Sequence, residues 1–334
     1  MKKILFISTG GTIVSSDNGD GFEPYYNVEK LIEAINMDDN CIIDGKLLMN
    51  IDSSNMNPIH WINIAKTIGE NYYKYDSFII SHGTDTMAYT SSALTYLLKG
   101  LNKPVIITGA QHSIEETYTD AIQNLNDALK FSLEEIAGVY ISFDGKLING
   151  TRAIKMKTMS YDAFKSINYP VVASIKYGEI RFESGIKNLI SRRENDIFNP
   201  CYELNSNIII IKLFPGINPL IFDFAMNNYD GVIIESFGIG GIPFKELNIH
   251  DKVKKMTDHG VTVVITTQCF EEGVDLSIYQ VGKKLMNNNI IFAGDMNTEA
   301  IVPKLMCALG KFSEFEERKQ YFEMPINGDK KMIV

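Results

Sequence analysis

Short apolar segments alternate with longer amphipathic ones along most of this 334-residue chain, and this alternation most constrains its fold. The short segments are apolar almost throughout, which is typical of parallel strands covered on both faces. Strands that alternate with helices form βαβ units, so the pattern predicts an α/β protein with a mainly parallel sheet. The expected strands are 4–7, 78–81, 105–108, 138–143, 208–213, 231–235 and 261–266, and the expected helices include 28–35, 58–74, 90–98 and 119–132.

A polar stretch interrupts this pattern beyond the middle of the chain. Residues 191–207 combine a charged run with Asn-Pro and Asn-Ser-Asn, which are typical of loops. A second alternation begins behind it, at Ile208. We therefore expect a larger N-terminal domain at 1–190, a linker at 191–207 and a smaller α/β domain at 208–334.

Charge and cysteine content narrow the possible partners and the location. The net charge is −9 and no basic block is present, which disfavours binding to nucleic acid or to an anionic membrane surface. The four cysteines are far apart and form no C-x-x-C pair, as expected inside the cell. The apolar run 4–7 is too short for a signal peptide or a membrane span, so we expect a cytoplasmic protein. The five histidines show no metal-binding spacing.

The first expected strand ends in segment 9–13, which reads Thr-Gly-Gly-Thr-Ile. Two glycines let the backbone turn sharply and leave amide N–H groups free to face an anion or an oxyanion. Thr12 adds a hydroxyl beside those donors, which is what acyl transfer requires. A tight turn or a phosphate loop is the alternative, although the spacing fits neither common glycine motif of nucleotide-binding loops.

The next strand leads into a Ser-His-Gly-Thr-Asp-Thr loop at 81–86. Thr84 and Asp85 present a hydroxyl and a carboxylate side by side, which suits the binding of a substrate amine or a proton relay. Capping of the following helix is the alternative reading. His82 is expected to be a packed, structural histidine.

Three further places carry polar residues near strand or helix ends. Segment 52–58 opens a helix, where Ser53, Ser54 and free N–H groups would fit a small carboxylate; a capping box is the alternative. The turn 108–111 ends a strand in small residues that would admit a ligand closely. Lys155 lies among apolar residues, where a partly shielded lysine is able to act as a base, whereas a surface lysine is the common alternative.

Taken together, these segments resemble the bacterial-type L-asparaginase family, in particular its cytoplasmic type I branch. Segment 9–13 resembles the first family signature and segment 82–90 the second. Residues 52–56 match the substrate-binding segment, and residues 151–155 match the segment of the catalytic lysine. Further matches follow in the family's order at 161–164, 238–243 and 295–300.

The resemblance implies hydrolysis of L-asparagine to L-aspartate and ammonia without a cofactor. Thr12 would be the nucleophile and would form a β-aspartyl ester, and Thr84, Asp85 and Lys155 would form a polar relay beside it. Sequence leaves open which threonine attacks first, and Thr12 is our expectation.

The resemblance also implies how the substrate is held. Asp85 would bind its α-ammonium group, and Ser53 with neighbouring N–H groups would bind its α-carboxylate. Asp52, Ser54, Thr84 and Gln111 complete the expected substrate-binding set.

One departure from the family concerns a lid that follows the first signature. Many relatives carry a tyrosine there, whereas this sequence has Phe22. A phenyl ring closes a pocket but passes no proton, so Tyr25, Tyr26 or a water molecule would activate Thr12. Glycines around this segment fit a mobile lid.

Assembly and regulation follow from the resemblance as well. Family members form dimers or tetramers with the active site near a subunit contact, which implies a homodimer or a homotetramer. Some cytoplasmic relatives bind a second, regulatory asparagine near a cysteine of the C-terminal domain. Gln268 and Cys269 resemble that place, but we expect Cys269 to be buried and structural.

Two alternatives to an L-asparaginase remain. The motifs do not fix the length of the substrate side chain, so glutamine is an alternative substrate. One family member is the glutaminase component of a tRNA-dependent amidotransferase, but it normally has an extra N-terminal domain, and the acidic charge here disfavours tRNA. An amino-acid-binding regulator without turnover is the other class: Phe22 favours it, and the joint presence of Thr12, Thr84, Asp85 and Lys155 argues against it.

Overall fold

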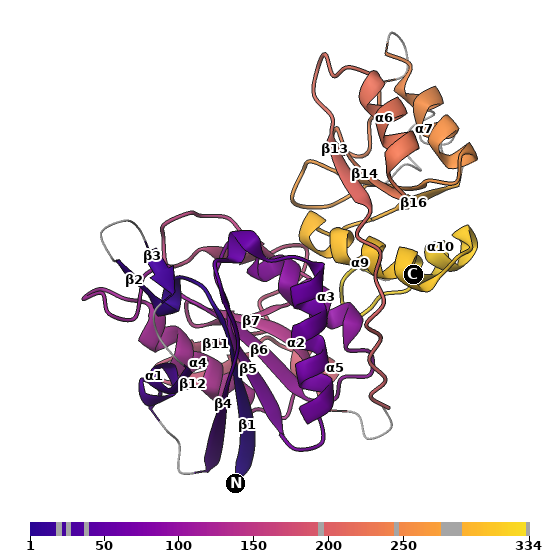
Figure 1. The fold of residues 1–334 in the computed structure, drawn as a ribbon. Helices are drawn as coiled ribbons and strands as arrows, with labels where there is room; N and C mark the ends of the chain where they lie inside the picture. Colours follow the sequence, from indigo (N-terminus) through magenta and orange to yellow (C-terminus); the bar gives the residue numbers. More distant parts are fainter. Residues whose placement is uncertain are drawn as a thin grey trace. The chain divides into compact units, whose positions relative to one another are not determined.

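The computed structural model describes residues 1–17, 22–24, 28–36, 40–192, 197–243, 247–274 and 289–331. The chain divides into two compact units, Met1–Tyr202 and Glu203–Val334. The division falls within the stretch 191–207. Figure 1 colours the first unit from indigo to magenta and the end of the second unit orange and yellow.

An eight-stranded sheet forms the centre of the first unit, in the order β12-β11-β8-β7-β6-β5-β1-β4. Its parallel part consists of β1 (Lys2–Gly10), β4 (Cys41–Ile51), β5 (Ser77–Ser81), β6 (Pro104–Thr108) and β7 (Gly138–Phe143). Antiparallel strands extend it: β8 (Lys146–Asn149), β11 (Ala173–Lys176) and β12 (Glu179–Phe182). The predicted mainly parallel sheet of the N-terminal domain is therefore confirmed.

Helices and two small hairpins complete this unit. The helices are α1 (Val28–Glu33), α2 (Pro58–Asn71), α3 (Met87–Leu97), α4 (Ala121–Ser132) and α5 (Ile186–Ile190), with 3-10 turns η1 (Thr12–Val14) and η2 (Ser53–Asn55). The hairpins pair β2 (Ser15–Asp17) with β3 (Phe22–Pro24) and β9 (Ala153–Lys155) with β10 (Phe164–Ser166). The start of α2 follows from its sequence, because Asn57 caps it, Pro58 occupies its first turn and His60 closes the capping box.

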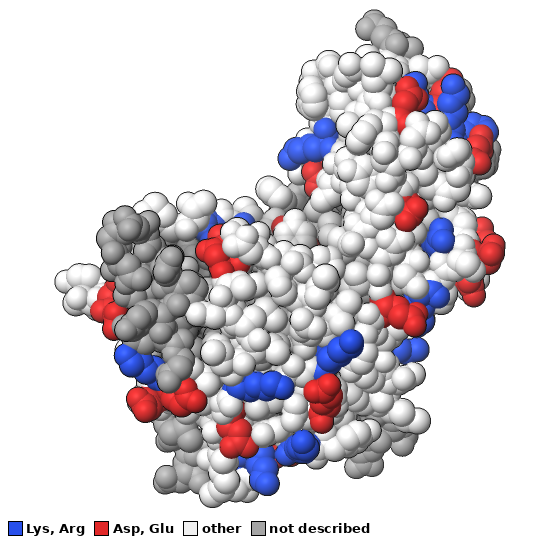
Figure 2. Space-filling view, viewed as in Figure 1, with Lys and Arg blue, Asp and Glu red and all other residues white. Residues whose placement is uncertain are grey.

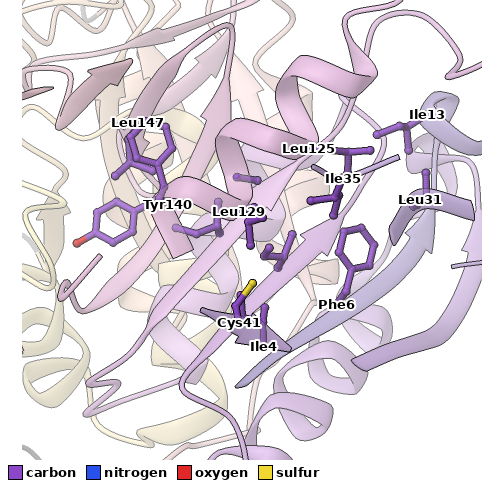
Figure 3. Packing of buried hydrophobic residues seen from close by; sticks show 14 of the residues in the cluster. Ile4, Phe6, Ile13, Leu31, Ile35, Cys41, Leu125, Leu129, Tyr140 and Leu147 are labelled. Carbon is purple, nitrogen blue, oxygen red and sulfur yellow. The ribbon is translucent and has the colours of Figure 1, made fainter. Parts of the chain in front are cut away.

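One hydrophobic cluster of the first unit joins the sheet to α1 and α4 (Figure 3). Ile4 and Phe6 of β1 point to this face, where Leu31, Leu125 and Leu129 of the two helices pack beside them. Each such side chain contributes about 1.5–3 kcal/mol when it is fully buried. The cluster therefore fixes β1, and with it the loop that follows β1.

The second unit contains a four-stranded parallel sheet. Its order is β13 (Ile208–Lys212), β14 (Gly231–Ser236), β15 (Thr262–Thr267) and β16 (Ile290–Phe292). The helices that the structure describes in this unit are α6 (Leu220–Asn228), α7 (Ile249–Asp258), α9 (Thr298–Lys311) and α10 (Phe315–Glu323). A separate hydrophobic cluster holds this unit together, and the predicted smaller α/β domain is confirmed.

Three features differ from the sequence-based expectations. Strand β4 was not among the expected strands, because it is an edge strand with a mostly half-exposed Asp-Gly-Lys-containing sequence. Part of the expected linker packs on the first unit, where Phe198 stacks on Tyr72 with ring centroids 3.7 Å apart. The prediction that Cys269 is buried is wrong: it is exposed, because it lies two residues past the end of β15, where the chain leaves the sheet.

Two further features concern the charge on the surface and the length and hydrophobicity of the helices. On the face that Figure 2 shows, acidic and basic side chains are interspersed, without a continuous basic patch. Within the described residues, no helix is both long enough and apolar enough to cross a bilayer.

Candidate active site

The parallel strands define where a ligand would bind. Strand β1 pairs with β4 on one side and with β5 on the other, so the chain changes direction across the sheet at β1. In such sheets ligands bind beyond the carboxyl ends of the strands at this switch point. Ser8 of β1 lies opposite Ser81 of β5, and Ser81 lies opposite Thr108 of β6. The loops that follow these strands therefore start at the same level.

The loops after β1 and β5 meet through their backbones, and the loop after β4 reaches them through the Ser53 side chain. A Cβ atom added to Gly11 would lie 2.4 Å from the amide nitrogen of Gly83, and one added to Gly83 would lie 2.6 Å from the Ser53 hydroxyl oxygen. Gly11 also has a φ of +88°, in the left-handed region that favours glycine. Glycine is thus required at position 11, and a side chain at position 83 would have to displace Ser53. The turn that carries Thr12 lies against the loops of Thr84 and Ser53.

His82 holds the loop after β5 in place through hydrogen bonds of its buried ring. It is fully buried, and burial lowers its pKa to about 4, so the ring is neutral. Its Nδ1 donates to the Gly83 carbonyl at 2.7 Å, and its Nε2 accepts from the Thr90 hydroxyl at 2.9 Å. Thr90 in turn accepts from Trp61 Nε1 at 3.0 Å. His82 is thus a packed residue with satisfied hydrogen bonds, as expected.

Lys155 contacts both polar groups of the loop after β5. Its Nζ donates to Thr84 Oγ1 at 2.7 Å and to Asp85 Oδ1 at 2.6 Å. The Lys155 side chain is 16% exposed and that of Asp85 is 65% exposed, while Thr84 is buried. Hairpin β9–β10 holds Lys155 there, since Lys155 pairs with Phe164. The arrangement links a hydroxyl, an ammonium group and a carboxylate, with the carboxylate open to solvent.

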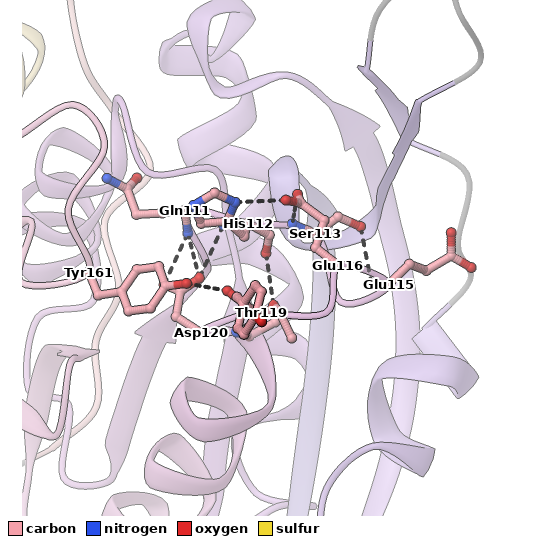
Figure 4. Close-up of polar contacts among 10 residues, drawn as sticks. Gln111, His112, Ser113, Glu115, Glu116, Thr119, Asp120 and Tyr161 are labelled. Atoms are coloured by element: carbon pink, nitrogen blue, oxygen red, sulfur yellow. Dashed lines mark hydrogen bonds and ion pairs between the residues drawn. The ribbon is translucent and has the colours of Figure 1, made fainter.

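Gln111 joins the same cluster from the loop after β6. Its Oε1 accepts from Thr84 Oγ1 at 3.2 Å. Its Nε2 lies 3.1 Å from both the Thr158 and the Ser160 carbonyl oxygens. The Asp120 carboxylate fixes the backbone of this loop, because it accepts from the amide nitrogen of Gln111 at 3.0 Å (Figure 4).

The remaining expected site residues lie on other segments of the first unit. Thr12 begins η1 directly after Gly11 and is partly buried. Asp52 caps η2 by accepting from the amide nitrogen of Ser54 at 2.7 Å, and both residues are exposed. Phe22 belongs to β3, where it pairs with Asp17. Tyr25 and Tyr26 lie outside the described residues.

The structure thus brings Thr84, Asp85, Lys155 and Gln111 into direct contact, and brings the turn of Thr12 and Ser53 beside them through the two glycines. Sequence reasoning missed Asp120, although a Thr-Asp pair before a helix is a recognisable signal. It also missed Thr158 and Ser160, which act through backbone carbonyls and so leave no signal in the sequence.

The types of side chain present indicate whether the described part of the chain could bind a metal ion. Among the described parts of the chain, no group of three or more His, Cys, Asp or Glu side chains could hold a metal ion. The polar side chains at the site instead carry hydroxyl, ammonium, carboxylate and amide groups. Such groups suit acyl chemistry by nucleophile, proton relay and hydrogen-bond donors.

Fold and site together define a two-domain α/β protein with a hydroxyl-based site at the switch point of its larger sheet. Comparison with known families agrees: "Asparaginase, N-terminal" matches residues 3–187, and "Glutaminase/Asparaginase C-terminal domain" matches residues 207–322. The chain therefore belongs to the asparaginase family of amidohydrolases.

Three relatives show the range of this family. An L-asparaginase of Thermococcus kodakarensis is 36% identical over 329 residues, covering 98% of both chains, and a solved structure of the thermostable L-asparaginase from that organism has a TM-score of 0.92. The solved L-asparaginase I of Vibrio cholerae has a TM-score of 0.87 at 30% identity, with 99% of each chain covered. A glutamyl-tRNA(Gln) amidotransferase subunit of Pyrococcus abyssi is 32% identical over 330 residues, which cover 95% of this chain and 74% of that protein.

Proposed function

We propose that this protein hydrolyses the side-chain amide of L-asparagine to L-aspartate and ammonia. The observation that carries the proposal is the bonding of one lysine, Lys155, to both Thr84 and Asp85 beside the turn of Thr12. Binding of an amino acid alone would need neither a second threonine nor a lysine at this place. The similarity to two L-asparaginases over nearly the whole chain supports the same substrate.

In the proposed first step, the Thr12 hydroxyl oxygen forms a bond to the amide carbon of asparagine. The carbon–nitrogen bond breaks, and the nitrogen leaves as ammonia with the proton of Thr12, which passes through the relay of Thr84 and Lys155. Water then splits the β-aspartyl ester. Its hydroxyl group stays on aspartate, and its remaining proton returns to Thr12.

The substrate would be fixed at both charged ends. The exposed Asp85 carboxylate would bind the α-ammonium group, and Ser53 with nearby backbone N–H groups would bind the α-carboxylate. Two such anchors position the amide against Thr12, and this orientation supplies part of the rate enhancement. The expected lid of Phe22 and Tyr25 belongs to this proposal and would close over the bound substrate.

Location, assembly and domain limits complete the proposal. The family resemblance supports a cytoplasmic homodimer or homotetramer that works without a cofactor, with domains at 1–190 and 208–334 joined by residues 191–207. Sedimentation velocity tests the assembly, since a monomer at micromolar concentration would contradict it.

A second candidate is the glutaminase component of a tRNA-dependent amidotransferase. The identity of 32% to the amidotransferase subunit of Pyrococcus abyssi favours it. The net charge of −9 and the interspersed charges of Figure 2 argue against a surface for tRNA. A non-catalytic amino-acid-binding regulator is the third candidate.

Ammonia release from L-asparagine, L-glutamine and D-asparagine separates these candidates, together with calorimetric binding of L-aspartate. We expect release that is fastest with L-asparagine. Faster release from L-glutamine would favour the amidotransferase component. Binding of aspartate without any release of ammonia would favour the regulator and contradict the proposal.

A further inference from the structure

We infer that Gln111 is a positioning residue that fixes the direction of the hydrogen bonds at Thr84, rather than a ligand of the substrate. The inference rests on the proposed function and refines it, because it assigns how the Thr84 hydroxyl is oriented before reaction. It also replaces our expectation that Gln111 binds the substrate.

The orientation of the Gln111 amide follows from its partners. Nε2 lies 3.1 Å from the carbonyl oxygens of Thr158 and of Ser160. Carbonyl oxygens only accept hydrogen bonds, so the NH₂ group must face them, and both of its hydrogens are used. The amide has no donor left for a substrate carboxylate.

The opposite end of the amide then determines the Thr84 hydrogen. Gln111 Oε1 only accepts, so at 3.2 Å it must receive the single hydroxyl hydrogen of Thr84. Thr84 Oγ1 therefore receives, rather than donates, the hydrogen bond from Lys155 Nζ at 2.7 Å. The direction runs from Lys155 to Thr84 to Gln111.

This direction has a consequence for the reaction. Thr84 Oγ1 keeps one lone pair free for the reacting groups, and the Lys155 donor stabilises negative charge that forms on that oxygen. Before Thr84 can give up its own proton, its hydrogen bond to Gln111 must break. Gln111 thereby affects turnover without touching the substrate.

The two segments that Gln111 connects, its own loop and the β9–β10 hairpin, are each held by further hydrogen bonds. On one side the Asp120 carboxylate accepts from the amide nitrogens of Gln111 and His112 at 3.0 and 3.1 Å (Figure 4). On the other side the loop 156–163 is the turn of the β9–β10 hairpin, closed by a 2.7 Å hydrogen bond from Met156 N to Ala163 O. Gln111 thus ties Thr84 to the hairpin that carries Lys155.

Neutron diffraction from deuterated crystals of the unliganded protein tests the inference directly. We expect deuterium on the line from Thr84 Oγ1 to Gln111 Oε1, and a Lys155 deuterium on the line to Thr84 Oγ1. A Thr84 deuterium that points to Lys155 would overturn the inference. This result stands whether or not the protein releases ammonia, so it separates the inference from the proposed function.

Kinetics of Gln111→Glu and Gln111→Met separate positioning from substrate binding. We expect kcat for ammonia release to fall about 10- to 100-fold, while the Kd of aspartate changes less than about threefold. Lys157→Gln is the matched control, since it breaks an exposed ion pair with Asp162 in the same loop and should keep wild-type kcat. A Kd raised about tenfold or more at unchanged kcat, or no effect of either variant, would contradict the inference.

Discussion

Lys155 and Thr84, which are 71 residues apart in the chain, are joined by a 2.7 Å hydrogen bond between Nζ and Oγ1. The contact depends on two separate connections, the loop after β5 and the β9–β10 hairpin. Ala153 and Ile154 of this hairpin are buried, and the Lys155 side chain is only 16% exposed. This contact is where the proposed relay begins.

Replacing Lys155 by methionine keeps the apolar stem and removes the ammonium group. We expect Lys155→Met to lower turnover of L-asparagine by about two orders of magnitude or more, because proton relays contribute about 10²–10⁴-fold. The Kd of aspartate should change little, since the proposed anchors of the substrate are Asp85 and Ser53. Steady-state ammonia release and calorimetry measure the two quantities. A Lys155→Met variant with wild-type turnover would remove this residue from the relay.

Alanine substitutions at two glycines with similar φ angles distinguish the cost of backbone strain from the cost of a steric overlap. Gly11 and Gly178 have φ of +88° and +82°, but an added Cβ at Gly178 has no neighbour within 4 Å. We expect Gly178→Ala to lower the free energy of unfolding by about 1 kcal/mol, and Gly11→Ala by about 3 kcal/mol or more, because its Cβ would overlap the backbone of Gly83. Urea unfolding of both variants measures this. Equal losses would show that the loops do not meet as described.

His82 predicts a pH dependence of stability. Its pKa is about 4 in the folded protein and 6.5 as a free side chain, so between these values the unfolded state binds the additional proton. The contribution of neutral His82 to the free energy of unfolding is complete above pH 6.5. It is lost as the pH falls from 6.5 to 4, by about 3 kcal/mol in total.

The test is urea unfolding across this pH range for the wild type and for His82→Gln, which does not titrate. The difference in unfolding free energy between the two proteins should shrink towards pH 4. Parallel profiles would contradict a buried, neutral His82.

A buried ion pair in the second unit gives a stability prediction. Lys304 Nζ and Asp329 Oδ2 are 2.6 Å apart, and both side chains are fully buried. Asp329→Ala leaves a buried ammonium group without its carboxylate, so we expect a loss of about 3–5 kcal/mol in the free energy of unfolding. The double variant Lys304→Met/Asp329→Ala should recover part of this loss.

The control for this prediction is a pair of equal length on the surface. Lys254 Nζ and Asp258 Oδ2 are also 2.6 Å apart, but their side chains are 52% and 62% exposed. Water screens such a pair, so Asp258→Ala should leave the unfolding transition unchanged. Equal losses from Asp329→Ala and Asp258→Ala would contradict the role of burial.

The sequence predicted the parallel strands well, because runs such as 78–81 are buried on both faces and therefore apolar throughout. It did not predict β4, since Asp44, Gly45 and Lys46 interrupt the apolar pattern of a half-exposed edge strand. Short strands such as β9 and β10, with three residues each, are too brief to give a pattern.

The candidate site was predictable to different degrees. Thr84 and Asp85 stand out because they follow a buried strand, where parallel sheets bind ligands. The contact of Lys155 with them depends on a hairpin far along the chain, and only the family resemblance indicated it. The hydrogen bonds of the Gln111 amide group were not predictable, because its partners at 158 and 160 are backbone carbonyl oxygens, which every residue possesses.

Ammonia release from L-asparagine by the wild type, Thr12→Ala and Thr84→Ala shows whether the two threonines carry the hydrolysis, with circular dichroism to show that each variant is folded. We expect release by the wild type and a fall to background in both variants, because one hydroxyl would carry the acyl group and the other its proton. Folded variants that still release ammonia at the wild-type rate would contradict it.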